Sequence, residues 1–334
     1  MNSIDVIVPC YRYGHFLREC VTSVLKQQGV QVRVLIIDDE SPDDTSRIGL
    51  QLCEEDSRVA YRRHSTNRGH IATYNEGLEW AQASYLLLLS ADDYLLPGSL
   101  QRATEFMEAH REIGFTFGDA VCLDANAPLP KLSRPSAQSK GRILNSLRFI
   151  RMLRAGNFVA TPTAVVRTSL QKQVGGYRAD LPHSGDLEMW LRLAAWAHVG
   201  KIDCDQAVYR QHGHNMSLSY KREHCLPDLI QRKAAFDVLL EGRSTALPLP
   251  ELGEAHRFLL QSLARTAVGY ARMALDHGEM DLTDRLSAFA VDTYPKVRGT
   301  LTWKLLALQR RCGLRVPSPL MSAVNRLRRL AARA

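Results

Sequence analysis

Acidic side chains that directly follow short apolar runs are the first candidates for chemistry in this chain. Asp39 follows the apolar run 32–37, and Asp92 and Asp93 follow the run 85–89. A carboxylate at a strand end can accept a hydrogen bond from a ring N–H of the kind that uracil and thymine offer, and paired carboxylates suit Mg²⁺ or Mn²⁺. Both patterns are also common in ordinary turns and helix lead-ins. Neither pattern therefore identifies a function by itself.

Asp186 is the candidate for moving a proton. It stands before residues 187–195, whose apolar positions have helical spacing. One carboxylate is enough to deprotonate a hydroxyl that attacks a carbon directly and inverts it, as the inverting glycoside hydrolases illustrate with a base opposite the leaving group. The alternative interpretation of Asp186 is a helix N-cap.

An aromatic residue and a histidine extend this set. Tyr11 follows the first apolar run and can stack on a base that Asp39 holds. His212 follows the run 207–211, and a neutral imidazole is a good metal ligand. His214 is the competing candidate, and an ordinary surface histidine is the alternative for either residue.

Apolar runs rich in Val and Ile alternate with segments of helical spacing over the first two thirds of the chain. We expect strands at 4–8, 32–37, 58–62, 85–89, 164–167 and 207–211, and helices at 15–28, 71–81, 97–110 and 187–195. Ser41 and Pro42 are expected to begin a further helix as its N-cap and first residue. This alternation predicts an α/β fold with a mostly parallel sheet and helices on both faces. In such sheets ligands bind at the carboxyl ends of the strands, where the candidate acids lie.

The remaining sequence predicts a helical region with a basic end. The helical pattern begins near residue 221, and residues 293–334 contain no Asp or Glu and ten Lys or Arg. The whole chain of 334 residues has a net charge of +8, so residues 1–292 are close to neutral. An apolar stripe at helical spacing predicts either a helix packed on the domain or a peripheral contact with anionic lipids: Leu320, Val324, Leu327 and Leu330.

Composition excludes several classes of protein. The chain has seven widely spaced cysteines and no CxxC pair, which argues against a disulfide framework or a thiolate zinc site and predicts reduced thiols in the cytoplasm. No apolar run reaches the roughly 20 residues of a membrane helix, and no signal peptide is recognised. No nucleic-acid-binding module is present, so nucleic acid is not an expected partner. The absence of GxGxxG after the first strand disfavours a dinucleotide dehydrogenase.

The order of these segments resembles family 2 of the glycosyltransferases. The resemblance covers about residues 3–217 and rests on the segments 8–11, 37–45, 67–69, 75–77, 89–98, 175–177, 186–192 and 209–212. It implies the GT-A fold of enzymes that use nucleotide-diphospho-sugars. Residues 1–220 would form the catalytic domain, and residues 221–334 a helical C-terminal region with a basic tail.

Roles follow from the resemblance position by position. Pro9, Tyr11 and Asp39 would contact the nucleoside, and Arg68 would border the base and the diphosphate. Asp92 would hold the metal, Asp186 would be the catalytic base, and His212 would complete the metal or diphosphate site.

The chain departs from the family pattern at three places. Ser90 stands where the family usually has a first acid; it can still hydrogen-bond the ribose, and the metal would depend more on Asp92. Gly185 stands where a Glu often precedes the base. The QxxRW segment of processive synthases is absent, which favours single additions.

The expected function is therefore an inverting, metal-dependent transfer of a sugar to a hydroxyl group. The expected donor is a UDP-sugar, with a dTDP-sugar second, and the expected cofactor is Mg²⁺ or Mn²⁺. The acceptor would be a saccharide or a lipid-linked saccharide in bacterial cell-surface polysaccharide or glycolipid synthesis. Two alternatives stay open: a non-catalytic sugar-nucleotide-binding protein, which Ser90 and Gly185 favour, and a sugar nucleotidyltransferase, which the missing glycine-rich loop in 8–15 disfavours.

Overall fold

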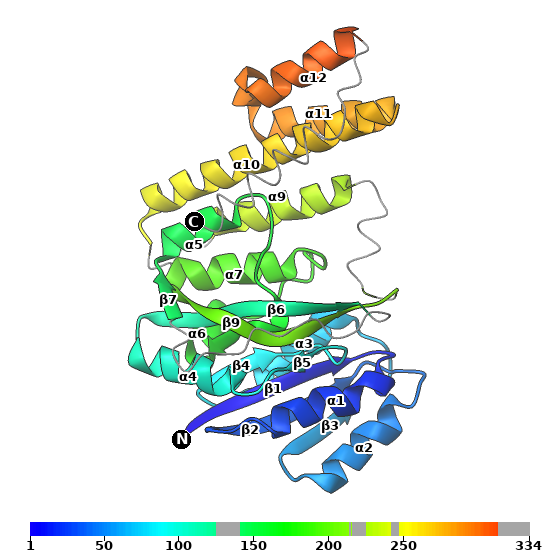
Figure 1. Cartoon of the computed structure of the whole chain (residues 1–334), viewed down its shortest axis with the longest axis vertical. Helices are drawn as coiled ribbons and strands as arrows, with labels where there is room; N and C mark the ends of the chain where they lie inside the picture. Colours follow the sequence, from blue (N-terminus) through cyan, green and yellow to red (C-terminus); the bar gives the residue numbers. More distant parts are fainter. Residues whose placement is uncertain (125–140, 214, 216–224, 242–246, 313–334) are drawn as a thin grey trace.

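The computed structural model describes residues 1–124, 141–213, 215, 225–241 and 247–312. Its centre is a nine-stranded sheet with the order β3-β2-β1-β4-β8-β6-β9-β5, and β7 pairs with β9 at the side of this path (Figure 1). The strands are β1 (Asn2–Cys10), β2 (Val30–Asp38), β3 (Val59–Arg63), β4 (Tyr85–Leu88), β5 (Tyr94–Leu95), β6 (Ile113–Asp124), β7 (Gly141–Leu144), β8 (Val165–Arg167) and β9 (His198–Gln211).

Helices cover both faces of this sheet and continue beyond it. They are α1 (Gly14–Leu25), α2 (Thr45–Glu55), α3 (His70–Trp80), α4 (Ser99–Ala109), α5 (Ser146–Leu153), α6 (Thr168–Val174), α7 (Gly185–Trp196), α9 (Leu226–Glu241), α10 (Leu249–Asp276), α11 (Met280–Thr293) and α12 (Leu301–Cys312), with short 3₁₀ turns η1 (Thr161–Thr163) and η2 (Pro295–Gly299). The predicted α/β class with a helical C-terminal region is confirmed.

Parallel pairing dominates the first half of the sheet. β1 lies between β2 and β4 and is parallel to both, and β2 is parallel to β3. The second half is mixed, because β8 is antiparallel to β4 and β6 while β6 is parallel to β9. The short strands β5 and β7 are antiparallel to β9.

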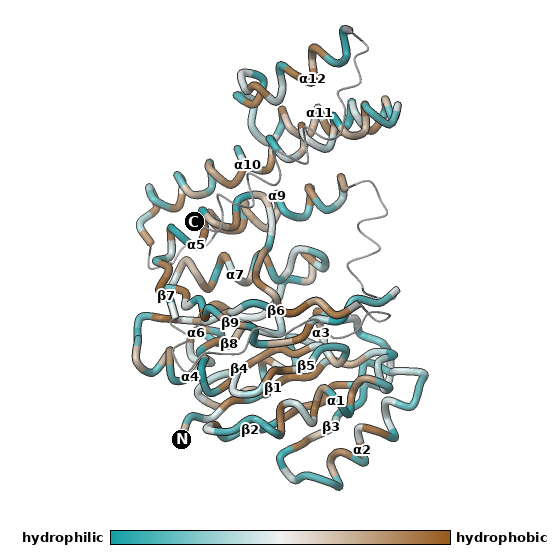
Figure 2. The backbone as a smooth tube through the Cα atoms, viewed as in Figure 1, coloured by the Kyte–Doolittle hydropathy of each residue, from teal (hydrophilic) through white to brown (hydrophobic). Residues whose placement is uncertain are grey.

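Alternate residues of β1 enter two different cores. Val6 and Val8 pack with Leu17 of α1, whereas Ile7 packs with Leu78 of α3 on the opposite face. Successive side chains of a strand point to opposite faces, so a strand covered on both sides must be apolar at almost every position. Figure 2 shows these apolar residues gathered along the strands in the middle of the molecule.

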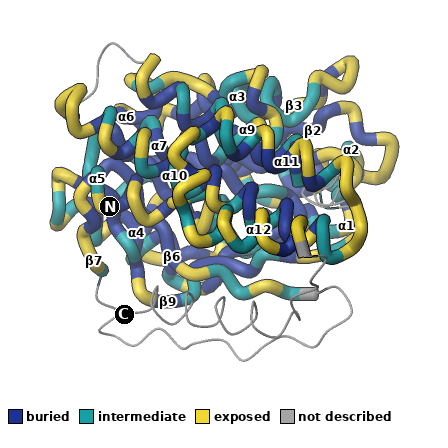
Figure 3. Tube along the Cα trace, turned by 90° about the horizontal axis from the view of Figure 1, so that it is seen from above, coloured by how far each residue is buried: buried dark blue, intermediate teal, exposed yellow. Residues whose placement is uncertain are grey.

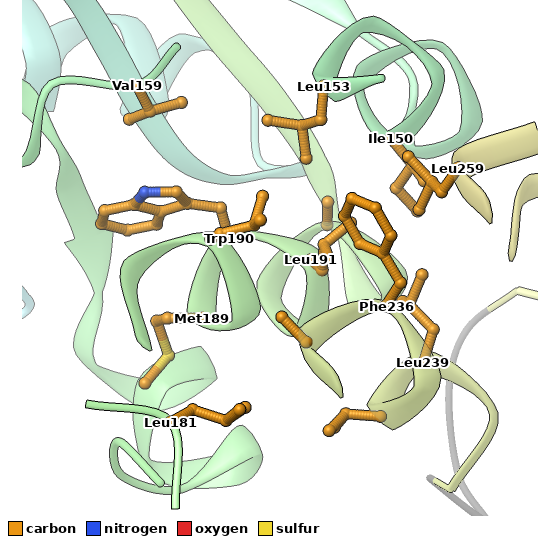
Figure 4. Packing of buried hydrophobic residues seen from close by; sticks show 14 of the residues in the cluster. Ile150, Leu153, Val159, Leu181, Met189, Trp190, Leu191, Phe236, Leu239 and Leu259 are labelled. Carbon is orange, nitrogen blue, oxygen red and sulfur yellow. The ribbon is translucent and has the colours of Figure 1, made fainter. Parts of the chain in front are cut away.

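The C-terminal helices stack on the sheet layer through a shared core. Phe236 of α9 lies among Leu191 of α7, Ile150 of α5 and Leu259 of α10 (Figure 4). Figure 3 shows buried and exposed residues alternating along these helices, as packing on one side requires. The sheet layer and the C-terminal helices therefore bury apolar surface together. The expected division at residue 220 falls within residues 216–224, outside the described part, and stays a prediction.

The prediction that Ser41 and Pro42 begin a helix is wrong. Helix α2 begins at Thr45. Ser41 instead joins two loops through its side chain, whose Oγ accepts from the N–H of Arg12 at 3.1 Å. Its own N–H donates to Asp38 Oδ1 at 2.7 Å within the same loop. A tertiary hydrogen bond thus takes the side-chain oxygen that a local cap would use.

Several elements carry no clear sequence signal. β5 and β7 are two and four residues long, and β6 is interrupted by glycine and aspartate, so their apolar periodicity is too short to detect. β9 begins at His198, well before the predicted 207–211. The apolar stripe of the tail lies outside the described residues. Among the described helices, none has the length and apolarity that crossing a membrane requires.

Close packing of α3 on β1 leads to a stability prediction. A Cβ atom at Gly77 would lie 2.2 Å from Cγ2 of Ile7, so Gly77→Ala should lower the free energy of unfolding by about 1–3 kcal/mol through overpacking. The matched control is Gly269→Ala within α10, where a Cβ meets nothing within 4 Å. That change should raise the same quantity by about 0.5–1 kcal/mol, since alanine favours helix interiors. Urea denaturation of both variants checks this, and shifts of the same sign would contradict it.

Candidate active site

A cavity of about 380 Å³ opens where β4 and β9 end, beside the first residues of α3 and α7. The segments that follow β1 and β4, together with β9 and the residues after it, line it with Tyr13, Ser90, Asp92, Asp93, Tyr209 and Asn215. Helix α3, the η1 turn, the segment before α7 and α7 itself line the rest with His70, Ile71, Tyr74, Thr161, Pro162, Tyr177, Pro182, His183, Gly185 and Asp186. Asp92 and Asp186, which lie far apart in the sequence, therefore face the same space.

The strand order brings the polar strand ends next to one another. Beyond the paired residues of the strands, the N–H of Ala91 donates to the carbonyl of Pro9 at 3.3 Å. On the other side of β1, the N–H of Asp39 donates to the carbonyl of Cys10 at 3.0 Å. Parallel strands end at the same edge, and these two bonds join the segment of Asp92 to that of Asp39 through the end of β1.

Asp92 and His212 form a close pair in this region. Nε2 of His212 lies 3.2 Å from Oδ2 of Asp92. The His212 ring stacks on Phe16 and meets Tyr13 edge-on, with ring centroids 5.5 and 5.2 Å apart. Burial raises the pKa of Asp92 above its ordinary value, and the neighbouring His212 opposes this increase.

Asp93 has a structural role beside this pair. Its Oδ1 accepts the N–H of Arg210 at 2.9 Å. The Arg210 guanidinium donates to the carbonyl of Asp92 at 2.9 Å and pairs with Glu19. It also lies over the rings of Phe16 and Tyr94. Burial, and then the charge of Asp92, raise the pKa of Asp93 well above its ordinary value. Arg210 is the buried cation that holds these two acids together.

The Asp92–His212 pair fits a divalent cation that takes its other ligands from a bound substrate. Among the described residues, Oδ1 of Asp92 is buried and has no hydrogen-bond partner. No cluster of three or more His, Cys, Asp or Glu side chains able to hold a metal occurs in the described part of the chain. Mg²⁺ and Mn²⁺ often use one or two protein ligands together with phosphate oxygens and water. A carboxylate with an unused oxygen and a neighbouring imidazole matches that mode.

Asp186 lies in the first turn of α7, and the N-cap position belongs to Ser184. Thr161 of η1 donates its hydroxyl to Oδ2 of Asp186 at 2.7 Å, and the Tyr177 hydroxyl also hydrogen-bonds this carboxylate. Burial raises the pKa of Asp186 above its ordinary value, and the two hydroxyls oppose the increase. A carboxylate held this way keeps a fixed orientation and becomes a stronger base than an exposed one.

Packing around Tyr177 explains one departure from the family pattern. Asn75 of α3 accepts the N–H of Tyr177 at 2.6 Å and donates to its carbonyl at 2.9 Å. A Cβ atom at Gly185 would lie 3.1 Å from the Tyr177 ring and 3.6 Å from Ile71. Helix α7 thus begins against a fixed aromatic ring, and a glycine before Asp186 avoids crowding it.

Asp39 lies at the end of β2 and outside the lining of the cavity. Its Oδ1 is 2.7 Å from Nδ1 of His64 and accepts the N–H of Arg68 at 2.7 Å, while Oδ2 accepts the N–H of Gly69 at 2.8 Å. The other ring nitrogen of His64 lies 2.9 Å from Glu76 of α3. Asp39 therefore holds the segment before α3 in place, and its contact with a nucleoside stays a prediction.

The other predicted donor-binding residues divide between these two regions. Ser90 lines the cavity with Asp92. Pro9 and Tyr11 stand at the end of β1, and the Tyr11 side chain is 41% exposed. The Arg68 side chain is exposed and pairs with Glu76 at 3.0 Å. The rival metal ligand His214 lies outside the described residues.

Several cavity residues were not singled out from the sequence. They include Thr161, Tyr74, His70 and His183, which come from three separate segments. Tyr177 appeared only within the Gly-Gly-Tyr segment of the resemblance. No local pattern marks these residues, because a tyrosine or threonine beside an apolar run is equally typical of a core or a turn.

Similar proteins support the same family. The model of "Glycosyl transferase family 2" matches residues 5–173, half of the chain. The first four curated relatives are 27–29% identical, and the chain spans only 31–66% of their own lengths. The Escherichia coli UDP-Glc:alpha-D-GlcNAc-diphosphoundecaprenol beta-1,3-glucosyltransferase WfgD is 22% identical over 201 residues, 60% of this chain and 73% of WfgD.

Solved structures share the fold. S. aureus TarS 1–349 in complex with UDP-GlcNAc superposes with a TM-score of 0.60 at 17% identity, over 94% of this chain and 92% of that one. The mannosyltransferase PcManGT from Pyrobaculum calidifontis in complex with GDP-Man and Mn²⁺ gives a TM-score of 0.50 at 16% identity, over 93% and 87%. Both likenesses concern the fold alone. The matched family model and the order of the strand-end acids together establish that the chain belongs to glycosyltransferase family 2.

Proposed function

We propose that this chain transfers a sugar from a UDP-sugar to a hydroxyl group of an acceptor, with inversion at the anomeric carbon. The observation that carries the proposal is the shared cavity of Asp92 and Asp186. A donor diphosphate held near Asp92 would leave its sugar between the two carboxylates. The reaction needs a carboxylate at each end of this space. One holds the cation that neutralises the departing diphosphate, and the other takes the proton of the attacking hydroxyl.

In this proposal Asp186 is the catalytic base. It takes the proton of the acceptor hydroxyl while that oxygen bonds to the anomeric carbon and the bond to the diphosphate oxygen breaks. Thr161 and Tyr177 keep the carboxylate oriented during this step. Because burial raises its pKa, the ionised group gains more from accepting a proton than an exposed aspartate would.

Asp92 and His212 would hold Mg²⁺ or Mn²⁺ on the donor side. The cation supplies Lewis-acid stabilisation of the diphosphate charge. The unpartnered Oδ1 of Asp92 and the nearby imidazole support this assignment. Ser90, in the same lining, would hydrogen-bond the ribose, and Arg210 keeps the acidic segment in place from behind.

The nucleoside would lie along the ends of β1 and β2, between Pro9, Tyr11 and Asp39, with Arg68 at its border. The Arg12 guanidinium lies over the Tyr11 ring, 5.5 Å from its centroid, and because the residue is exposed a base would stack on the opposite face of the ring. Oδ2 of Asp39 accepts a hydrogen bond from the N–H of Gly69, so a carboxylate oxygen retains capacity for a ring N–H. The bound UDP-GlcNAc of TarS and the UDP-Glc in the name of WfgD support a uridine donor.

A saccharide on a lipid diphosphate is the acceptor class we favour, in the synthesis of a bacterial cell-surface polysaccharide or glycolipid. The name of WfgD includes such an acceptor. The shared cavity of Asp92 and Asp186 and the membership of glycosyltransferase family 2 favour an enzyme over a non-catalytic binding protein. A screen of UDP- and dTDP-sugars by thermal shift with and without Mn²⁺, followed by assay of UDP release, tests this choice. Binding without any release of UDP would favour the binding protein instead.

Replacing the base should separate chemistry from binding. Asp186→Asn should lower turnover by about 10²–10⁴-fold, the usual contribution of a general base, and leave the donor-induced thermal shift unchanged. The matched control is Asp180→Asn, an exposed acid of the preceding segment that pairs with Arg178, and it should retain activity. Turnover of Asp186→Asn within threefold of wild type would exclude Asp186 as the base.

The raised pKa of Asp186 also predicts two effects of pH and charge. The base must be ionised, so activity should fall as pH decreases, with the acidic limb of the pH profile above the ordinary aspartate pKa of about 3.9.

Because the folded state favours the neutral carboxyl of Asp186, the ionised group costs stability at pH values above its raised pKa. Asp186→Asn removes that cost, and its melting temperature at pH 7.5 should equal or exceed that of wild type in calorimetry. A clear decrease would mean that the carboxylate stabilises the fold.

Removing the metal ligands should abolish the cation-dependent part of donor binding. Mn²⁺ with UDP should raise the melting temperature of the wild type, because a ligand that binds only the folded state stabilises it. Asp92→Asn and His212→Ala should each reduce this additional shift to less than half. His110→Ala, which alters a half-exposed histidine elsewhere, is the control. An undiminished shift in both variants would exclude this pair as the metal site.

A further inference from the structure

Helix α9 of the C-terminal region contacts the cavity-lining segment that precedes α7. Gln231 donates to the carbonyl of Asp180 at 3.4 Å and accepts the N–H of His183 at 3.4 Å. Arg178 pairs with Glu241 at the far end of α9 at 2.9 Å. Helix α9 therefore fixes the course of this segment along most of its length.

A buried carboxylate of α9 reaches the edge of the cavity. Oδ1 of Asp228 lies 2.8 Å from Nε2 of His183, which lines the cavity with Asp186. Arg232, one turn along α9, pairs with Asp228 at 2.6 Å and donates to the carbonyl of Ala155 at 2.7 Å. Although burial opposes ionisation, the hydrogen bond from His183 and the charge of Arg232 hold the pKa of Asp228 below its ordinary value.

This geometry determines which nitrogen of His183 carries the hydrogen. An ionised Asp228 only accepts hydrogen bonds, so Nε2 of His183 is the donor. In the neutral ring, Nδ1 is then an acceptor. The same logic fixes the tautomer of the histidine in Asp–His pairs of hydrolases.

The position of α9 is itself rigid. Its Phe236 and Leu239 pack in the core shared with α5, α7 and α10 (Figure 4). A charge presented from a well-packed helix keeps a fixed direction. The segment before α7 lacks regular structure between residues 175 and 184, so α9 supplies the rigidity that its histidine needs.

We propose that α9 is part of the acceptor site, with Asp228 as a positioning residue that holds the His183 imidazole where it hydrogen-bonds a hydroxyl of the acceptor saccharide. The inference rests on the proposed function and deepens it. His183 lies three positions before Asp186 in the sequence and lines the same cavity. The hydroxyl that His183 holds belongs to the same sugar as the hydroxyl that Asp186 deprotonates. The imidazole therefore selects acceptor sugars that carry both hydroxyls.

The test compares two contacts of the same helix with the same segment. In Asp228→Asn an amide NH₂ replaces one carboxylate oxygen. Only one oxygen then remains to accept hydrogen bonds from His183 and Arg232. His183→Ala removes the imidazole. Glu241→Gln is the matched control, because it alters an exposed ion pair between α9 and Arg178, and exposed ion pairs contribute little to stability.

The assay uses the full chain with Mn²⁺, UDP-glucose or UDP-N-acetylglucosamine, and N-acetylglucosamine linked through diphosphate to a short polyprenol as the probe acceptor. Asp228→Asn and His183→Ala should raise the KM for the acceptor about tenfold or more. Both should leave the thermal shift by UDP with Mn²⁺ unchanged, because that shift reports donor binding on the Asp92 side of the cavity. Glu241→Gln should match the wild type in the acceptor KM, in the thermal shift and in the release of UDP to water.

A spectroscopic measurement tests the positioning without any acceptor. In ¹⁵N-histidine-labelled protein, the ring signals missing from His183→Ala identify His183, and they should show the Nε2–H tautomer. Asp228→Asn should shift them and Glu241→Gln should not.

The outcomes separate the inference from the proposed function. A wild type that neither releases UDP nor gains stability from UDP with Mn²⁺ would overturn the proposed function. An active wild type whose acceptor KM is unchanged in Asp228→Asn and His183→Ala would overturn the inference alone. His183 ring signals that do not shift in Asp228→Asn would also overturn the inference. Equal losses of sugar transfer to the acceptor and of UDP release to water would do the same.

Discussion

The parallel pairing of β1 with β2 and β4 is the constraint on which the site depends. Parallel strands end at one edge, and the hydrogen bonds of Asp39 and Ala91 to the end of β1 extend this pairing into the loops. The acids after β2 and β4 consequently meet along a continuous edge. An antiparallel partner at either side of β1 would send one of these loops to the opposite end of the sheet.

Acids that meet at this edge repel one another, and the surrounding residues reduce that repulsion. Asp92 and Asp93 are buried next to each other, and their pKa values are raised by burial. Arg210 of β9 brings a positive charge to these acids. Its guanidinium donates to the carbonyl of Asp92, and its backbone N–H donates to the carboxylate of Asp93. A divalent cation on Asp92 would reduce the repulsion further. Two acids buried this close together lower the stability of the fold, which is common where function competes with stability.

The C-terminal helices are more than an appendage to the sheet. They share the core of α5 and α7, and α9 presents Asp228 and Gln231 to the segment that borders the cavity. The same apolar packing therefore stabilises the fold and orients polar groups near the site. A chain that ended before α9 would leave α7 exposed on the face that Phe236 covers.

The sequence determined the local parts of this protein. The apolar runs predicted the first four strands, because a strand buried on both faces must be apolar at almost every position. Acids follow two of these runs, 32–37 and 85–89, and they marked polar strand ends. Asp92 could be proposed in this way, Asp186 from its place before a helical pattern, and Ser90 from the family resemblance. The structure brings all three to one cavity. The order of motifs also gave the family and the GT-A fold.

Only the tertiary structure decided which partners these residues have. Asp39 is bound by His64 and by two backbone N–H groups, Ser41 accepts a hydrogen bond from another loop rather than capping a helix, and His183 depends on Asp228 of a distant helix. Each of these contacts is a hydrogen bond between groups brought together by packing. A local pattern records what a residue can offer to its neighbours along the chain, whereas the acceptor that it finds depends on how the whole chain folds.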